Sequence, residues 1–279
     1  MTNLALLHTG LRGDEKLIIA AAKDQNLNLE LIDIRTVALN PQNIETWQKF
    51  DVILERCIST VKGNATIEFL DNMGLNIVNN SQIMQICNDK FQTATVLDNA
   101  NVPNLRSILV FNEDQAKEVV EELGGYPIVI KSREGSWGRL MGKINDADAL
   151  ESIFEHRKFM GPEQSAVVIQ EYVNKPENRD VRAFVVDGEC ICAIYRQSPH
   201  WITNTARGGT ASNCPVNEEM INLCRNASDA IGGGILAIDV FETDEGLKIN
   251  EINHTMEFKN SETPTGVSIS GAIVDYCIK

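Results

Sequence analysis

The sequence has little positive charge. Its 279 residues include 25 lysines and arginines against 39 aspartates and glutamates, so the formal net charge is −14 at pH 7. Binding to nucleic acid through the phosphate backbone needs a positive field, and this composition argues against it. A local group of lysines and arginines can still oppose the global sign and hold a small anionic ligand such as ATP.

Long hydrophobic runs are also missing. No stretch of about 18 or more apolar residues occurs, so no membrane-spanning helix is expected. The first residues lack a basic region and a cleavage site, which is typical of a first strand rather than a signal peptide, and a cytoplasmic location is the expectation. The apolar fraction of 43% is sufficient for a sizeable core, and 279 residues suit two or three modules in one compact body.

Cysteine and histidine form no metal-binding pattern. The seven cysteines contain no CxxC pair and the four histidines no i, i+4 pair, so we expect reduced, mostly buried thiols instead of a zinc site or a disulfide framework. Cys190 and Cys192 stand two apart in an apolar run and are expected to share one strand face. The GxSxG and GxxxxGK[ST] motifs are absent, which gives no support to that class of hydrolase or to a P-loop.

Three successive patterns predict three modules. Residues 1–88 alternate short strands with helices, as in a small parallel α/β domain. Residues 89–168 predict an α+β module in which a strand over 103–110 and a hairpin have helices on one side. Residues 169–279 are dominated by β-strands and contain a hairpin around the turn 243–246.

This late hairpin is the strongest single motif. Alternation along a strand directs Glu251 and Asn253 to the same face, and Asp239 on the partner strand can approach them. Two carboxylates and an amide oxygen suit Mg²⁺, which proteins usually hold together with substrate phosphates. The alternative is a solvated acidic surface, but apolar residues flank both acids, and unpaired carboxylates are costly to bury.

A second candidate region surrounds Lys131. This lysine ends an apolar strand directly before the glycine-rich segment 132–138, whose backbone N–H groups can bind phosphate oxygens. The alternative is an ordinary hairpin turn. Lys90 opens an earlier helix and could converge with Lys131 on one polyphosphate, although a single lysine is more often solvated. The strand end 170–173 can bind an adenine edge through its backbone or be a plain strand end.

Arginines interrupt the apolar runs of the last module. Arg182 and Arg196 need an anionic partner there, which can be a ligand or an internal acid, and the residues leave both options open. Arg207 lies in a polar loop with two glycines that could close over a reacting centre. His254, directly after the metal hairpin, has either a substrate contact or a structural role.

The motifs of this sequence resemble those of the ATP-grasp superfamily, in the same order along the chain and over essentially all residues. These motifs are the two lysines, the glycine-rich segment, the 170–173 segment and the acidic hairpin. The strings 196–209 and 250–261 are similar to those of the LysX ligases. The resemblance implies an ATP-grasp fold with three subdomains, in which a parallel α/β domain precedes a central ATP-binding module and a C-terminal antiparallel-sheet module.

The resemblance also implies a reaction. ATP would phosphorylate the side-chain carboxylate of the C-terminal glutamate of LysW, a small acidic carrier protein. The α-amino group of 2-aminoadipate would then attack the acyl phosphate, forming an amide in lysine biosynthesis. The implied cofactors are ATP and Mg²⁺, and a homodimer or homotetramer is the family-level expectation.

Roles for individual residues follow from the same resemblance. The implied ATP-binding residues are Lys90, Lys131, Gly135, Ser136, Trp137, Gly138, Gln170, Glu171, Tyr172, Val173 and Asp180. The implied Mg²⁺ ligands are Asp239, Glu251 and Asn253, and the residues expected to stabilise the acyl phosphate are Arg196, Asn204 and Arg207. The candidate substrate contacts are Arg182, His254, Asn260 and Ser261.

Three other interpretations compete with this one. Glutamate-using relatives, the ArgX enzymes, carry Gly-Phe where this sequence has Asn260 and Ser261, so we expect aminoadipate to be preferred. A RimK-like glutamate ligase is a second possibility that the strings 196–209 and 250–261 disfavour. A non-catalytic ATP-dependent binding protein is the third, although no metal ligand or phosphate-binding lysine is missing.

Overall fold

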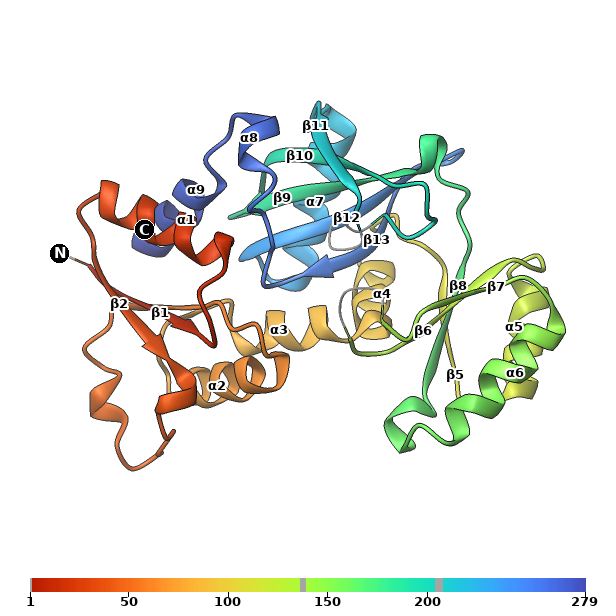
Figure 1. Ribbon diagram of the computed structural model, residues 1–279, viewed down its shortest axis with the longest axis horizontal. Helices are drawn as coiled ribbons and strands as arrows, with labels where there is room; N and C mark the ends of the chain where they lie inside the picture. Colours follow the sequence, from red (N-terminus) through yellow and green to blue (C-terminus); the bar gives the residue numbers. More distant parts are fainter. Residues whose placement is uncertain (1, 136–138, 204–207) are drawn as a thin grey trace.

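The computed structural model describes residues 2–135, 139–203 and 208–279, which form three sheets with helices on their faces (Figure 1). The predicted mixture of a parallel α/β part and antiparallel α+β parts is confirmed. Within the described residues, none of the helices combines the length and the apolar character that crossing a membrane requires.

The N-terminal sheet is parallel, with the strand order β2-β1-β3-β4. Its elements are β1 (Asn3–His8), α1 (Gly13–Asp24), β2 (Asn28–Asp33), η1 (Ile34–Thr36), η2 (Ile44–Thr46), β3 (Val52–Glu55), α2 (Thr60–Asn72), β4 (Ile77–Val78) and α3 (Ser81–Asn88). Alternate residues of β1 enter different cores: Leu4 and Leu6 pack against α1, whereas Ala5 and Leu7 pack against α2. A strand covered on both faces is therefore apolar throughout.

The central sheet is antiparallel, with the order β5-β8-β6-β7. The elements of this region are α4 (Lys90–Asn99), β5 (Ser107–Val110), α5 (Glu113–Glu122), β6 (Ile128–Ser132), β7 (Gly142–Ile144), α6 (Ala147–Lys158), η3 (Pro162–Gln164), β8 (Val167–Glu171) and η4 (Pro176–Asn178). The helices α5 and α6 cover the outer face of the sheet, at the right of Figure 1. The inner face is left for contacts with the rest of the molecule.

Two boundaries of the central region differ from the sequence prediction. The limit at residue 168 falls inside β8, and the whole of β8 pairs with β5 and β6, so the central sheet extends to Glu171. The expected strand over 103–110 begins only at Ser107. Its first residues instead pair with β13 of the C-terminal sheet, where the N–H of Leu105 donates to the carbonyl of Ile249 at 2.9 Å. The chain thus passes from one sheet to the other at residue 106.

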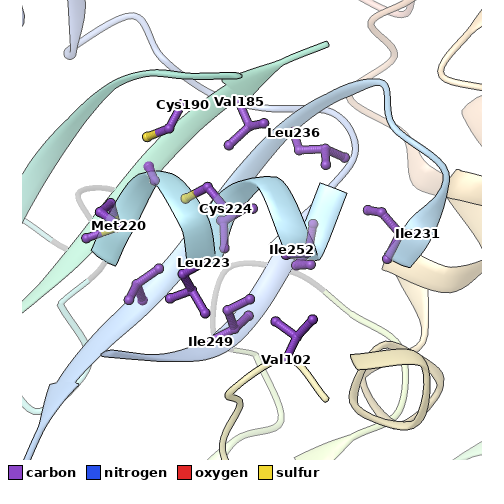
Figure 2. Close-up of a cluster of buried hydrophobic side chains, with 14 of the residues drawn as sticks. Val102, Val185, Cys190, Met220, Leu223, Cys224, Ile231, Leu236, Ile249 and Ile252 are labelled. Atoms are coloured by element: carbon purple, nitrogen blue, oxygen red, sulfur yellow. The ribbon is translucent and has the colours of Figure 1, made fainter. Parts of the chain in front are cut away.

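The C-terminal sheet is antiparallel, with the order β11-β10-β9-β12-β13. Its elements are β9 (Arg179–Val186), β10 (Glu189–Gln197), β11 (Thr210–Cys214), α7 (Glu218–Ile231), β12 (Ile235–Thr243), β13 (Gly246–Asn253), α8 (Glu262–Thr265) and α9 (Ile269–Ile278). Figure 2 shows α7 covering one face, where Leu223 lies close to Ile249 and Cys224 lies on the side of Cys190 and Val185. A site on these strands must therefore use the opposite face.

That other face changes character along β9 and β12. Phe184 and Ala237 are buried against the N-terminal region and α9, in a core that also contains Phe258. Further along the same face, Arg182 and Asp239 replace apolar side chains. The apolar end fixes the N-terminal region to this sheet, and the charged end faces the central sheet.

The cysteines are free and buried throughout the described residues, as expected. The prediction that Cys190 and Cys192 share a face is wrong. The pairing of β10 with β9 shifts register between them, so Cys190 enters the core under α7 and Cys192 the core on the opposite face. A β-bulge of this kind inserts one residue and inverts the alternation beyond it.

Candidate active site

A cleft of about 750 Å³, including the space at its mouth, lies between the central and the C-terminal sheets. We call it the intersheet cleft. One wall comes from β6, β8 and the segment after β8, and the other from β9, β10, β12 and β13. The predicted site residues that line it are Lys90, Lys131, Gly135, Gln170, Glu171, Tyr172, Val173, Asp180, Arg196, Asp239 and Glu251.

Lys131, at the end of β6, is held by neutral partners. Its Nζ donates to Gln170 Oε1 at 2.7 Å and to Asn250 Oδ1 at 2.9 Å. It forms no ion pair with any carboxylate in the described part of the chain. Burial, opposed by Glu251 and assisted by Lys90, lowers the pKa of Lys131 to about 8. Its positive charge is therefore available to an anionic ligand in the cleft.

Asn250 reaches Lys131 because of a β-bulge. The strands β12 and β13 pair Asp239 with Glu251 and Val240 with Ile249, which leaves Asn250 as the extra residue on β13. A bulge bends its strand and redirects a side chain. The irregularity thus connects the C-terminal sheet to the lysine of the central sheet.

Lys90 approaches the same region from the start of α4. Its Nζ donates to the carbonyl of Gly135 at 2.7 Å and lies 3.7 Å from Glu251 Oε1. Its backbone N–H donates to the carbonyl of Arg133 at 2.9 Å, and Arg133 is ion-paired with Asp89, the residue that caps α4. These contacts hold the described start of the glycine-rich segment next to Lys90.

An apolar slot occupies the part of the cleft beside the end of β8. Val129 and Met141 line it from the central sheet, and Ile202 and Phe241 from the other side. Tyr172 stands at this end, with Lys143 Nζ 3.8 Å from the centre of its ring. A flat aromatic group fits such a lining, and the strand end 170–173 offers backbone groups beside it.

Other parts of the strand end are already engaged. The side chain of Gln170 accepts from Lys131 and donates from Nε2 to Ser107 at 3.0 Å. The carboxylate of Glu171 accepts from the N–H of Arg106 at 2.8 Å. Both side chains therefore hold the central sheet together at its inner edge.

The C-terminal wall carries a buried network of arginines and aspartates. Asp239 accepts two hydrogen bonds from Arg182, at 2.8 and 3.0 Å, and lies 3.0 Å from Arg196 Nη2. Asp180 accepts two from Arg196, at 2.8 and 2.9 Å, and one from Thr203 Oγ1 at 2.5 Å. The internal ion pair, one of the two options left open for Arg182 and Arg196, is present.

This network keeps Asp239 ionised. Burial alone would raise the pKa of Asp239, but Arg182 and Arg196 outweigh it and lower the pKa to about 2. Burial would likewise lower the pKa of Arg196, but Asp239 and Asp180 reverse that effect and raise it. Paired, hydrogen-bonded charges of this kind persist in a protein interior because each partner compensates the other.

The predicted metal ligands are placed in two ways. Asp239 and Glu251 lie directly opposite each other on β12 and β13, and both line the intersheet cleft. Two carboxylates together with phosphate oxygens are a suitable donor set for Mg²⁺. Asn253 pairs with Ala237 and lies outside the lining, and its buried Nδ2 has no hydrogen-bond partner among the described residues. The two acids fit the ion, with Asp239 sharing its oxygens with the arginines.

The candidate substrate contacts lie away from the cleft lining. Arg182 stands behind Asp239. His254 Nε2 is 3.3 Å from Asn88 Oδ1, and burial, with a smaller effect of Arg56, lowers its pKa to about 4. Asn260 is exposed, whereas Ser261 is buried and its N–H donates to the carbonyl of Phe258 at 2.7 Å. His254 thus has the structural contacts that were one of its two options.

Five predicted residues, Ser136, Trp137, Gly138, Asn204 and Arg207, lie outside the described residues. Other residues of the cleft were not anticipated from the sequence, notably Asn250, Lys175, Thr203 and Phe241. Asn250 adjoins Glu251 in the same motif, but nothing in the sequence marks the bulge that turns it toward Lys131.

Two family models match successive parts of the chain. The model described as "LysX preATP-grasp domain" matches residues 4–86, and the model described as "RimK-like ATP-grasp domain" matches residues 87–277. The α-aminoadipate–LysW ligase LysX of Sulfurisphaera tokodaii is 33% identical, with 97% of this chain and 96% of the relative covered. The glutamate–LysW ligase ArgX of the same organism is 30% identical, with 95% and 94% covered.

Two solved structures share the fold. A RimK domain ATP-grasp protein from Sphaerobacter thermophilus superposes with a TM-score of 0.81 at 24% identity, covering 100% of both chains. The D-alanine–D-alanine ligase of Bacillus anthracis in complex with ATP gives a TM-score of 0.71 at 17% identity, covering 100% of this chain and 96% of the other. The chain therefore belongs to the RimK-like ATP-grasp family and is an ATP-dependent carboxylate–amine ligase.

Proposed function

We propose that this ligase joins the α-amino group of 2-aminoadipate to the γ-carboxylate of the C-terminal glutamate of a LysW carrier protein. The observation that carries the proposal is the intersheet cleft, where Lys131, hydrogen-bonded only to neutral amides, faces the carboxylates of Asp239 and Glu251. Relatives named as LysW ligases, at 33% and 30% identity over nearly the whole chain, support the choice of carrier.

ATP would occupy the cleft with its base and phosphates at opposite ends. The base would enter the apolar slot between Val129 and Phe241 and meet the backbone of 170–173. The phosphates would then lie at Lys131 and Lys90. The fold neighbour from Bacillus anthracis, solved in complex with ATP, supports nucleotide binding in this architecture.

In the first step, an oxygen of the carrier's carboxylate would attack the γ-phosphorus of ATP. The bond from that phosphorus to the β–γ bridging oxygen breaks, ADP leaves, and an acyl phosphate forms. Lys131 and Lys90 would orient the phosphates and offset their charge. Asp239 and Glu251, with Asn253 as a further candidate, would hold Mg²⁺, which when bound neutralises phosphate charge.

In the second step, the amine of the amino acid would attack the acyl carbon. Phosphate leaves, the amide forms, and the proton of the amine is released to solvent. Arg196 is the described candidate for stabilising the negative charge on the acyl oxygen, and Asn204 and Arg207 stay predictions for the same role. Asp180 fixes the orientation of Arg196 through two hydrogen bonds.

The choice between aminoadipate and glutamate rests on Asn260 and Ser261. This pair follows the LysX-like pattern, and we propose that aminoadipate is preferred. Glutamate is the second candidate, because the ArgX relative is nearly as similar as the LysX relative. Residues on the segment after β13 would then act on the amino acid from outside the described cleft lining.

Mass spectrometry of the carrier tests the proposal. Purified LysW would be incubated with the protein, ATP, Mg²⁺ and either aminoadipate or glutamate. The expected product is carrier with one aminoadipyl group, formed faster than the glutamyl product at equal concentrations. A clear preference for glutamate would overturn the assignment of the amino acid and leave the carrier assignment intact.

Phosphate release provides the matched control. ADP and phosphate should accumulate only when carrier and amino acid are both present. Turnover with glutamate and a different protein acceptor, but not with LysW, would favour a RimK-like activity. Tight ATP binding without turnover on any acceptor would favour a binding protein.

A further inference from the structure

Lys175, in the segment between β8 and β9, places a second buried ammonium group on the cleft. Its side chain is only 8% exposed and it lines the intersheet cleft. Its Nζ donates to Thr203 Oγ1 at 3.0 Å and lies over the ring of Phe241, 5.0 Å from the ring centre. The motifs of the sequence give this lysine no role.

The charge of Lys175 is only partly compensated. The nearest acid, Asp180, lies 3.9 Å away, beyond hydrogen-bond distance. Both oxygens of Asp180 already accept hydrogen bonds from Arg196, and one accepts from Thr203 as well. An ammonium group has three donors, and the described contacts of Lys175 use one of them on a hydroxyl.

The position of Lys175 complements that of Lys131. Phe241 is two residues from Asp239 on β12, so both side chains point to the cleft face of the C-terminal sheet. Lys175 lies over Phe241 on this wall, whereas Lys131 belongs to the central sheet opposite. The two ammonium groups repel each other across the cleft, and burial lowers the pKa of Lys175. An anion between them would relieve both effects.

We propose that Lys175 binds a phosphate oxygen of the nucleotide from the C-terminal wall, opposite Lys131. The proposal rests on the nucleotide position given under the proposed function. Lys175 follows the strand end 170–173 and lies beside Asp180. We therefore expect it to contact the phosphate nearest the sugar. The cleft would then hold the phosphates between two lysines from different sheets.

Calorimetric titration of Lys175→Met with ADP and with adenosine, both without Mg²⁺, tests this contact. A charge-assisted hydrogen bond to phosphate predicts about a 10- to 100-fold weaker affinity for ADP. The affinity for adenosine, which has no phosphate, should stay within about threefold of wild type. Lys175→Gln keeps a hydrogen-bond donor for Thr203 without the charge and should show the same loss for ADP.

Lys49→Met is the matched control. Lys49 is also a lysine with its ammonium over an aromatic ring, that of Phe50 at 4.7 Å, but both residues belong to the N-terminal region and lie outside the described lining. It should bind ADP as wild type does. Thermal unfolding of each variant without nucleotide confirms that the protein is folded.

The outcomes separate the possible causes. An equal loss for ADP and adenosine would overturn the proposal, because Lys175 would then act by holding Asp180 and Thr203. Unchanged ADP affinity in folded Lys175→Met and Lys175→Gln would overturn it as well. If the wild-type protein itself does not bind ADP, the proposed nucleotide position is wrong and the role of Lys175 is lost with it.

Discussion

The two walls of the intersheet cleft hold their charges by opposite means. On the central sheet, Lys131 is buried among neutral amide oxygens of Gln170 and Asn250. On the C-terminal sheet, Asp239 and Asp180 are buried among guanidinium groups. On one wall Lys131 therefore has no ion-pair partner among the described residues, and on the other wall the charges compensate each other.

This difference separates binding from scaffolding. An ammonium group that interacts only with amides loses little when a phosphate approaches, because it exchanges no ion pair. A carboxylate already bound to two arginines has a fixed position and charge, which suits a group that must hold a cation at a defined place. The central wall is thus arranged to receive an anion, whereas the C-terminal wall is arranged to keep its shape.

The largest effect is expected from breaking the C-terminal network. Arg196→Met would leave Asp180 without its guanidinium partner, whereas Asp239 keeps Arg182, and an uncompensated buried charge costs about 3–5 kcal/mol of unfolding free energy. Urea denaturation measures this change. The double variant with Asp180→Asn should recover part of the loss, because it removes the charge that has lost its partner.

Arg179→Met is the control for this prediction. Arg179 lies on the neighbouring strand and pairs with Glu242 and Glu177, but it is partly exposed. Its removal should cost no more than about 1 kcal/mol. Equal losses for the two arginines would mean that the network of Arg196 has no special importance for stability.

A smaller effect, on function alone, is expected from the central wall. Lys131→Met should reduce turnover about 100-fold while the protein remains folded, because a preorganised charge at the phosphates is lost. Asn250→Asp keeps the lysine but gives it an acidic partner, and the affinity for ADP should fall about tenfold. Steady-state kinetics and titration with ADP measure the two changes.

Lys117→Met is the matched control, since Lys117 is a surface lysine of α5 paired with Glu113. Turnover should be unchanged in this variant. If Asn250→Asp bound ADP as tightly as wild type, the neutrality of the partners of Lys131 would be irrelevant, and the contrast between the walls would be lost.

The sequence was sufficient for the regular parts of this site. Asp239 and Glu251 could be placed on the two strands of one hairpin because the turn between them is short, but a regular register would pair Asp239 with Asn250, and the bulge brings Glu251 opposite Asp239 instead. Lys131 could be placed at a buried strand end because an apolar run precedes it. Both are local inferences, in which the spacing of residues determines the geometry.

The remaining features depend on contacts between distant segments. The bulges at Asn250 of β13 and between Cys190 and Cys192 of β10 change which face a side chain occupies, and no residue type marks them. The ion pair between Arg196 and Asp239 joins two strands that are separated by β9 in the sheet. Lys175 reaches the cleft because the segment between β8 and β9 brings it over the ring of Phe241 on β12. The alternation of side chains along a strand cannot predict this contact.

The two walls should also differ in how the stability of the protein depends on pH. The pKa of Lys131 is about 8 in the folded protein against an ordinary value of 10.5. Below pH 8 both the folded and the unfolded chains hold this proton. Between pH 8 and 10.5 the unfolded chain binds more protons, so this lysine makes unfolding less favourable as the pH rises, by at most about 1.4 kcal/mol per pH unit.

Asp239 responds at the other end of the scale. Its pKa is about 2 in the folded protein against an ordinary value of 3.8, so its contribution to stability is complete above pH 3.8 and is lost as the pH falls through 2.

Urea unfolding of wild type and Lys131→Met from pH 7 to about 10 isolates the contribution of the lysine, because the other titrations cancel in the difference. The wild type should gain stability relative to the variant as the pH rises. Saturating ADP should reduce that gain, because a bound phosphate raises the pKa of Lys131 again. Parallel profiles with and without ADP would mean that the ammonium of Lys131 is not the uncompensated charge that distinguishes the central wall.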